Sequence, residues 1–258
     1  MVDLAGRSAL VAGGAGGLGA ATVRHLVGRG VGVVAFDRGG DRLDRLAGEL
    51  GAAVVAVRGD TNDDADVGAA IAAAESLGTF SIVVNVAGGG GLGEGRTLSE
   101  GGTPYDMDVF VRTMAGNAFA TFNVTRLAVA AMAGNIPDTD GQRGVVVNTA
   151  SIAAFEGQVG QVAYGSAKAA ILGMTLPMAR DLAPVGIRVC AIAPGPMATP
   201  ALLRAPEALQ DRLAAGVPFP PRLGRPEEFA LLVESIVQNP YLNGVHLRLD
   251  GALRLPPE

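Results

Sequence analysis

Three polar side chains near the middle of the chain have the types and spacing of a proton-transfer site. Tyr164 and Lys168 are four residues apart, so on a helix they lie on one face, one turn apart. A free tyrosine, with a pKa of about 10, is a weak base at neutral pH, and a neighbouring ammonium favours its phenolate. Ser151 follows the apolar run GVVVN, and its hydroxyl can donate to the oxygen that Tyr164 protonates or deprotonates. The three residues predict acid–base chemistry at a substrate oxygen.

A second pattern, near the N-terminus, predicts a dinucleotide site. A short apolar strand, a glycine-rich turn and a helix follow one another in SALVAGGAGGLGAATVRHLVGRG. Glycines let the backbone approach a ligand, and the first turn of the helix offers free N–H groups to a pyrophosphate. The next apolar run ends at Asp37, whose carboxylate can bind a ribose diol and would repel a 2′-phosphate. Although Arg38 follows, this pattern favours NAD over NADP. The cofactor-binding residues predicted in this region are Gly13, Gly17, Leu18, Gly19 and Asp37.

The composition is that of a single α/β domain over residues 1–258. Hydrophobic residues make up 49% of the chain and charged residues 17%, which suffices for a sheet buried on both faces. A net charge of -5 argues against a nucleic-acid or membrane-binding face. One cysteine, Cys190, permits no disulfide within the chain, and two distant histidines, His25 and His246, exclude a histidine-rich metal site. With no signal peptide or membrane span expected, we predict a cytoplasmic protein.

Apolar runs and helical patterns alternate along the chain. This alternation predicts a Rossmann-like, doubly wound parallel sheet of seven strands with helices on both faces. The expected strands are Ser8–Ala12, Gly32–Asp37, Ala53–Gly59, Ser81–Asn85, Gly144–Asn148, Ile187–Ile192 and Val245–Leu249. In such a sheet, ligands bind beyond the carboxyl ends of the strands. We therefore expect Asp37, Asp60, Asn85, Ser151 and Pro194 to gather on one rim.

Three segments interrupt this alternation. The glycine-rich segment 88–105 is expected to be a mobile, solvent-facing loop that helps to select the substrate. The polar stretch 135–143 is expected to be a surface loop. Pro177 falls within the helix that carries Tyr164 and Lys168, and it should kink or distort that helix.

These motifs together resemble the short-chain dehydrogenase/reductase family over nearly the whole chain. The glycine motif of the family corresponds to Ala12, Gly13, Gly17 and Gly19, and its Asn-Asn-Ala-Gly motif to Asn85, Val86, Ala87 and Gly88. Its catalytic Asn, Ser, Tyr and Lys correspond to Asn117, Ser151, Tyr164 and Lys168. Its late Pro-Gly and Thr correspond to Pro194, Gly195 and Thr199. The resemblance implies that Lys168 also binds the nicotinamide ribose, and that Asn85, Ala87, Gly88, Pro194, Gly195 and Thr199 contact the cofactor.

The segments RGVVVNTASIAAFEGQVGQVAYGSAK and VPFPPRLG resemble one subfamily, the type II 3-hydroxyacyl-CoA dehydrogenases, also described as hydroxysteroid dehydrogenases. This resemblance implies NAD, a homotetramer and a secondary-alcohol substrate such as a 3-hydroxyacyl-CoA. A 17β-hydroxysteroid or other small alcohol dehydrogenase and an NADPH-type 3-oxoacyl reductase are alternatives, and Asp37 argues against the reductase. A non-catalytic nucleotide-binding or scaffold subunit is a further alternative. The presence of Ser151, Tyr164 and Lys168 argues against it.

Four residues have two interpretations each. By resemblance, Asn117 would hold a water that relays protons from Lys168, or it would stabilise a kink in its helix. Asp60 would lie near the adenine, or would cap the helix that begins in TNDDADV. Gln158 and Gln161 would line the substrate pocket, or would hydrogen-bond within their loop.

Overall fold

The centre of the molecule is one parallel sheet of seven strands. A computed structural model describes residues 4–89 and 95–257 of the chain. The strands are β1 (Arg7–Ala12), β2 (Gly32–Asp37), β3 (Val54–Arg58), β4 (Thr79–Asn85), β5 (Gly144–Thr149), β6 (Ile187–Pro194) and β7 (His246–Leu249). They run in the order β3-β2-β1-β4-β5-β6-β7, and every neighbouring pair is parallel. This confirms the predicted fold, with strand ends displaced by at most two residues.

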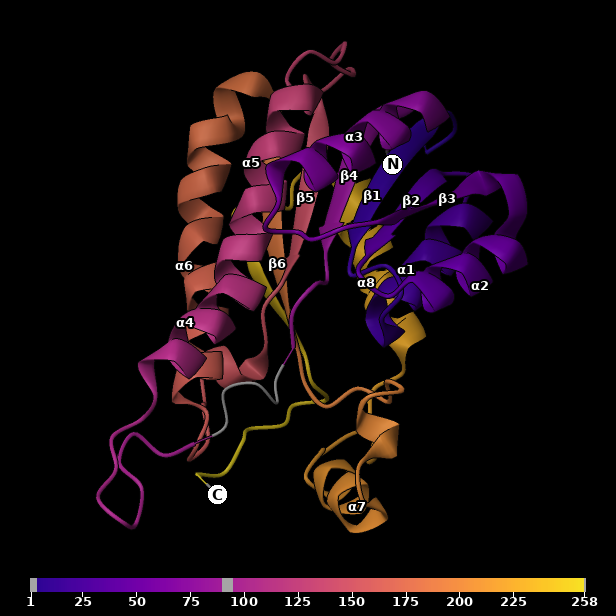
Figure 1. Cartoon of the computed structure of the whole chain (residues 1–258). Helices are drawn as coiled ribbons and strands as arrows, with labels where there is room; N and C mark the ends of the chain where they lie inside the picture. The colour runs from indigo at the N-terminus through magenta and orange to yellow at the C-terminus, as the bar shows by residue number, and fades with distance from the viewer. Residues whose placement is uncertain (1–3, 90–94, 258) are drawn as a thin grey trace.

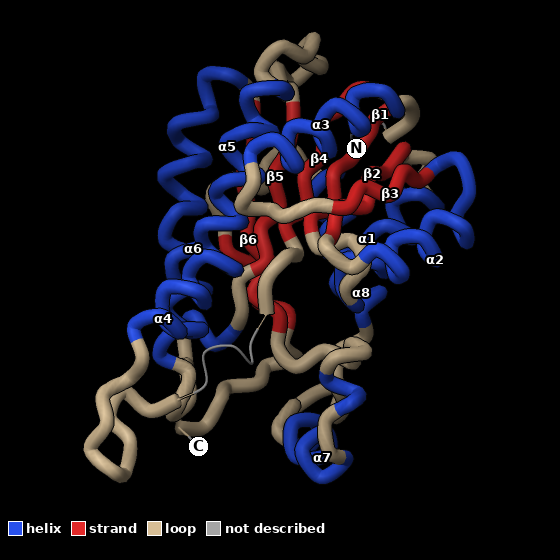
Figure 2. Tube along the Cα trace, viewed as in Figure 1, coloured by secondary structure: helices blue, strands red, loops and turns tan. Residues whose placement is uncertain are grey.

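Helices cover both faces of the sheet (Figures 1 and 2). Alternate side chains of the strands β1–β6 enter opposite sides of the apolar core, as in β1, where Val11 faces one cluster and Leu10 the other. Helices α1 (Gly17–Gly28), α2 (Gly40–Leu50) and α8 (Pro226–Gln238) pack on one face, and α3 (Asp64–Leu77), α5 (Ala120–Met132) and α6 (Val162–Leu182) pack on the other. None of the helices in the described ranges is both long and apolar enough to cross a membrane.

The strand order reverses between β1 and β4, and this creates a crevice at the carboxyl edge of the sheet. The register brings Ala12 beside Asn85 and Asn85 beside Asn148, so the loops after β1, β4 and β5 leave the sheet at the same level. Below this edge stand helix α7 (Glu207–Ala215) and the C-terminal segment, drawn in orange and yellow in Figure 1. Helix α4 (Met107–Met114) lies on the other side and continues into α5 through the π-helical turn Ala115–Phe119.

Helix α6 continues without a break through Pro177. The proline removes the N–H that would bond to the carbonyl of Gly173, and both residues lie on the exposed face of the helix, where water can replace that bond. The expected distortion therefore does not end the helix. It leaves the first turns, which carry Tyr164 and Lys168, within one regular element.

The two predicted loops are more ordered by hydrogen bonds than their composition indicates. In the described part of segment 88–105, Leu98 and Pro104 form an isolated antiparallel bridge, and Gly95 N donates to Gly160 O at 2.8 Å. Residues 97–104 are exposed, as expected, and residues 90–94 lie outside the described part of the chain. The loop 135–143 is also at the surface, but Asn135 Nδ2 anchors its start to the carbonyl of Phe80 at 2.7 Å.

Candidate active site

The three side chains predicted to transfer a proton meet at the carboxyl edge of β5. Ser151 follows this strand and caps a short 3-10 turn, its hydroxyl accepting a hydrogen bond from Ala153 N at 3.1 Å. Tyr164 and Lys168 lie one turn apart near the start of α6, and the Tyr164 hydroxyl is hydrogen-bonded to Ser151. Lys168 Nζ lies 5.8 Å from the centre of the Tyr164 ring and donates to Thr149 O at 3.0 Å. The structure therefore brings all three residues together.

Burial determines the protonation of this group. Lys168 is 2% exposed, and its removal from water lowers the pKa of its ammonium to about 8. Burial raises the pKa of the Tyr164 phenol, and the hydrogen bond with Ser151 opposes that rise. The sequence predicted a lowered Tyr164 pKa, and the contacts of the chain itself have the opposite net effect. The reason is that Lys168 directs its ammonium to Thr149 O, while the surrounding protein removes part of the water around the half-buried phenol.

The glycine turn after β1 packs against two other loops of the rim. Gly13 has a φ of 81°, and a Cβ at this position would lie 2.6 Å from Ala87 N. A Cβ on Gly17 would lie 2.7 Å from the Cβ of Thr199, in the segment after β6. Gly19 packs against Gly13 within the turn and does not line the cavity described below. Side chains larger than hydrogen would therefore push these loops apart.

The same turn has the features of a pyrophosphate site. The N-cap of α1 is Gly16, which has no side chain to bond the first N–H groups of the helix, and the first helical turn carries no acidic residue. At the end of β2, the Asp37 carboxylate accepts hydrogen bonds from Ala15 N at 3.2 Å and Gly39 N at 3.0 Å. Free N–H groups near a fixed carboxylate match the phosphate and ribose groups of a dinucleotide. The residues present thus fit a nicotinamide cofactor.

The Asn85 side chain links neighbouring elements of the sheet layer. Its side chain is 2% exposed, and its amide donates to Asn148 Oδ1 at 2.9 Å and to Thr125 Oγ1 at 3.0 Å. It does not line the cavity. The amide therefore joins β4 to β5 and α5, and contact of Asn85 with the cofactor stays a prediction.

Asn117 lies within the π-helical turn between α4 and α5. Its amide donates to Thr113 O at 3.0 Å and to Gly89 O at 3.5 Å. These bonds stabilise the wider turn, which agrees with the interpretation of Asn117 as a residue that stabilises a kink. Its Oδ1 is buried and accepts no hydrogen bond from the described residues. Turns of this kind are frequent at functional sites. The proton relay from Lys168 stays a prediction.

Asp60 does not cap a helix. The N-cap of α3 is Asp63, whose carboxylate accepts hydrogen bonds from Ala65 N at 2.9 Å and Asp66 N at 3.0 Å. Asp60 accepts a hydrogen bond from Asn62 N at 2.9 Å and lines the cavity. The helix-cap interpretation is thus wrong, and the contact with adenine stays a prediction.

One cavity of about 840 Å³ connects the glycine turn to the catalytic group. The predicted site residues that line it are Gly13, Gly17, Leu18, Asp37, Asp60, Ala87, Gly88, Asn117, Ser151, Gln158, Gln161, Tyr164, Lys168, Pro194, Gly195 and Thr199. Sequence reasoning missed an apolar group beyond Ser151, formed by Ile152, Ala153, Met197, Leu202, Ala205, Leu213 and Leu255. Several of these belong to the helical pattern ALLRAPEALQDRLAAG, whose apolar spacing was the available signal.

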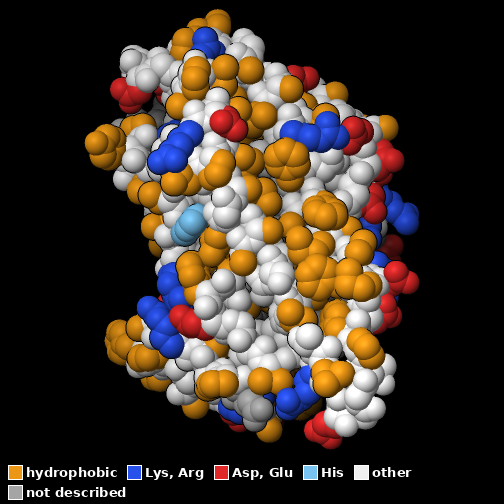
Figure 3. Space-filling view, turned by 90° about the vertical axis from the view of Figure 1, so that its left-hand side faces the viewer, with side chains coloured by type: hydrophobic (Ala, Val, Ile, Leu, Met, Phe, Trp, Pro, Cys, Tyr) orange, Lys and Arg blue, Asp and Glu red, His pale blue; other side chains and the backbone are white. Residues whose placement is uncertain are grey.

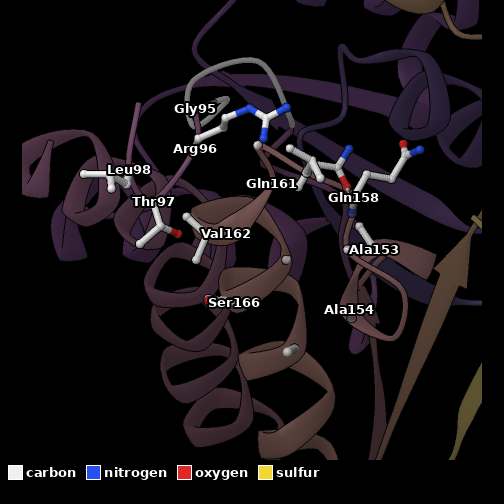
Figure 4. Close-up of a pocket in the computed structure, with 15 residues that line it drawn as sticks. Gly95, Arg96, Thr97, Leu98, Ala153, Ala154, Gln158, Gln161, Val162 and Ser166 are labelled. Carbon is white, nitrogen blue, oxygen red and sulfur yellow. Dashed lines mark hydrogen bonds between the residues drawn. The ribbon is translucent and has the colours of Figure 1, made fainter. Parts of the chain in front are cut away.

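Gln158 and Gln161 hydrogen-bond within their loop and also line the cavity, and their contact with the substrate stays a prediction. They bond each other, Gln158 N donating to Gln161 Oε1 at 3.1 Å, and both line the cavity. Figure 4 shows them at the start of α6, where they also border a neighbouring cavity of about 580 Å³ that extends toward Gly95 and Leu98. The two side-chain amides therefore lie where the cavity of the Ser151–Tyr164–Lys168 group meets the cavity near the loop of Gly95 and Leu98.

The described residues contain no group of three or more His, Cys, Asp or Glu side chains that could hold a metal ion.

A doubly wound sheet, a glycine turn beside a carboxylate, and a Ser–Tyr–Lys group on one cavity define an oxidoreductase that uses a nicotinamide cofactor. The chain belongs to the short-chain dehydrogenase family, whose model matches residues 7–209.

Curated and solved relatives agree with this membership. The chain is 47% identical to human 3-hydroxyacyl-CoA dehydrogenase type-2 over 253 residues, which cover 98% of this chain and 97% of the human protein. The crystal structure of 3-hydroxyacyl-CoA dehydrogenase type-2 from Mycobacterium avium matches with a TM-score of 0.96 and 45% identity over 98% of both chains. A 7α-hydroxysteroid dehydrogenase complexed with NADH and 7-oxo glycochenodeoxycholic acid matches with a TM-score of 0.85 and 28% identity, over 99% of this chain and 97% of that one.

Proposed function

We propose that this protein is an NAD-dependent dehydrogenase that interconverts 3-hydroxyacyl-CoA and 3-oxoacyl-CoA. The observation that carries the proposal is the Ser151–Tyr164–Lys168 group on the wall of one cavity, between a dinucleotide-binding turn and an apolar pocket. The full-length similarity to proteins named 3-hydroxyacyl-CoA dehydrogenase type-2 supports the choice of acyl-CoA.

The Asp37 carboxylate supports NAD as the cofactor. It is fixed by Ala15 N and Gly39 N, so it cannot turn away from a ribose bound at the end of β2. A 2′-phosphate in that position would lie against a like charge. Arg42 approaches Asp37 only to 3.9 Å, and Arg38 is 79% exposed and lies 3.9 Å from Asp60. Neither cation cancels the preference that the carboxylate imposes.

The catalytic side chains act on the oxygen of the substrate carbinol. Tyr164 takes the hydroxyl proton, and Ser151, already hydrogen-bonded to Tyr164, donates to the same oxygen as negative charge develops on it. Lys168 places an ammonium one helical turn from the phenol and holds the end of β5 through Thr149 O. When bound, the nicotinamide ring supplies the hydride acceptor. In the reverse direction Tyr164 returns the proton.

We also propose a homotetramer located in the cytoplasm. Figure 3 shows hydrophobic side chains gathered over the face that carries α4 and α6. On α5 and α6, Phe122 is 49% exposed, Val162 40% and Leu176 41%. Such apolar area on helix faces supports association between copies of the chain. The single, buried Cys190 supports a reducing compartment. Light scattering after size exclusion tests the assembly, and a mass of one 25.9 kDa chain would contradict it.

Steady-state oxidation tests the function. The enzyme is assayed with NAD and with NADP, using 3-hydroxybutyryl-CoA and a 17β-hydroxysteroid side by side. We expect NAD-linked turnover of the acyl-CoA to exceed that of the steroid. Preference for the steroid would favour the hydroxysteroid alternative, which the similarity to a 7α-hydroxysteroid dehydrogenase also supports. Binding of NAD without turnover of either substrate would refute the acyl-CoA assignment and leave the cofactor assignment in place.

A further inference from the structure

The C-terminal segment Leu253–Pro257 borders the cavity through Leu255. Figure 1 shows it in yellow below the carboxyl edge of the sheet, between α7 and the side that carries α4. Leu255 lines the cavity and packs against a small cluster that includes Ile152, the residue directly after Ser151. Leu253 and Val217 complete this small cluster, which is separate from the two large clusters of the sheet. An apolar side chain of the last residues thus lies next to the reacting centre.

The loop between Ser151 and Tyr164 donates hydrogen bonds to backbone carbonyls of this segment. Val159 N donates to Pro257 O at 2.9 Å, and the Gln158 side-chain amide donates to Pro256 O at 3.1 Å. Gln158 also lines the cavity. The position of the C-terminal segment and the position of a pocket amide are therefore coupled.

Glu156 anchors this arrangement. Its carboxylate accepts hydrogen bonds from both terminal nitrogens of Arg248, at 2.8 and 3.2 Å. It also accepts one from the backbone N–H of Leu255, at 3.0 Å. Arg254 adds a third cationic contact at 3.4 Å. The hydrogen bonds from Arg248 hold the pKa of Glu156 below its usual value, so the carboxylate stays charged.

The anchor is itself fixed to the end of the sheet. Arg248 lies on β7, donates to Asp250 Oδ2 at 2.6 Å and to Leu253 O at 3.0 Å, and its guanidinium stacks 5.1 Å from the centre of the Phe155 ring. The side chain of Asp250 is 7% exposed and that of Glu156 is 23% exposed. Partly buried, bidentate Arg–carboxylate contacts of this kind keep one geometry better than single surface pairs do.

We infer that Leu253–Pro257 forms the wall that limits the bulk of the substrate chain, and that Glu156 is the positioning residue that holds this wall. The inference rests on the proposed function for its substrate, since a 3-hydroxyacyl chain extends from the carbinol into the apolar pocket of Ile152, Leu213 and Leu255. Glu156 does not line the cavity. It acts through Leu255 and through the Gln158 loop.

Substitutions at Leu255 test the wall. The ratio of kcat/KM for 3-hydroxydecanoyl-CoA to that for 3-hydroxybutyryl-CoA is measured for wild type, Leu255→Ala and Leu255→Phe. We expect the ratio to rise about tenfold or more in Leu255→Ala, the scale of a few methylene contacts in an apolar pocket, and to fall in Leu255→Phe. Affinity for NAD, measured by calorimetry, should be unchanged. Equal ratios in all three proteins would overturn the assignment of the wall.

Hydrogen exchange tests the anchor and needs no substrate. In Glu156→Gln, we expect faster exchange at the amides of Val159 and Leu255. In the acyl-CoA assay, the same variant should show a larger rise in KM than fall in kcat. Glu49→Gln is the matched control, because Glu49 also bonds an arginine, Arg24, at 2.7 Å, but through side chains that are 50% and 47% exposed. The same exchange in both variants would overturn the role of Glu156.

Arg254→Gln gives a second variant of the anchor in case Glu156→Gln does not fold, since the Arg254 side chain is 60% exposed. It should show a smaller effect of the same sign on exchange, and no effect would count against the anchor. If wild type oxidises no acyl-CoA, the proposed function fails, while the exchange measurements still decide the role of Glu156. The Leu255 ratios are then measured with a small and a bulky secondary alcohol that wild type does oxidise.

Discussion

The buried ammonium of Lys168 makes a quantitative prediction about stability. The pKa of this group is 10.5 in an exposed reference lysine and about 8 in the folded chain, where the side chain is 2% exposed. Between these two values the unfolded chain holds a proton that the folded chain has lost. The free energy of unfolding therefore rises with pH across this window. Each pKa unit corresponds to about 1.4 kcal/mol, so the difference in pKa corresponds to roughly 3 kcal/mol.

Replacing Lys168 by methionine isolates this contribution. Methionine has a similar length and no charge, so the variant loses the titration and the bond to Thr149 O while still filling the site. Urea unfolding of both proteins is followed at half-unit steps from pH 7 to 10.5. Subtraction of the two curves removes the titrations that they share. We expect wild type to gain about 3 kcal/mol relative to Lys168→Met, with nearly all of the gain above pH 8.

The control is the region below pH 7.5, where Lys168 is charged in both the folded and the unfolded chain and the difference between the proteins should be constant. A constant difference over the whole range would refute the reasoning, because it would mean that Lys168 binds its proton as tightly in the folded chain as in the unfolded chain. A gain confined to values above pH 10 would give the same answer.

Three other predictions concern the cavity. Tyr164→Phe should lower turnover by roughly 10²–10⁴-fold, the usual contribution of a positioned acid–base group, with NAD affinity nearly unchanged in calorimetry; a small loss of turnover would remove Tyr164 from proton transfer. Asp37→Asn should shift the ratio of kcat/KM for NAD to that for NADP toward NADP by at least about tenfold, since a like charge is removed from the ribose site; an unchanged ratio would refute the ribose assignment. Gly17→Ala should cost about 1–3 kcal/mol of unfolding free energy, because its Cβ would lie 2.7 Å from the Cβ of Thr199; wild-type stability in urea would show that the loop can move aside.

The parts of the fold that depend on local sequence could be predicted. Strand positions follow from short apolar runs, and the glycine turn, Asp37 and the Tyr164–Lys168 spacing are each contained in one segment. The meeting of Ser151 with Tyr164 could also be expected, because a strand end and the next helix start lie on the same rim.

Other features depend on contacts between distant segments, and the sequence does not contain them in readable form. Asn85 pairs with Asn148 because β4 and β5 share a register, and 63 residues separate the two. The anchor of Glu156 on Arg248 joins residues 92 positions apart. Asp63 and not Asp60 caps α3, a difference of less than one turn that propensity cannot decide among several nearby acids.

The protonation of the catalytic group shows why the fold alone does not complete the site. A nearby ammonium favours phenolate, and this argument predicted a lowered Tyr164 pKa. Burial works against each charge separately, however: it lowers the Lys168 pKa to about 8 and raises that of Tyr164. Both shifts oppose an ammonium–phenolate pair formed by these two side chains alone. The phenolate needs a further positive charge in the cavity. An oxidised nicotinamide would supply one, so the proposed proton abstraction by Tyr164 would depend on the same cofactor that would accept the hydride.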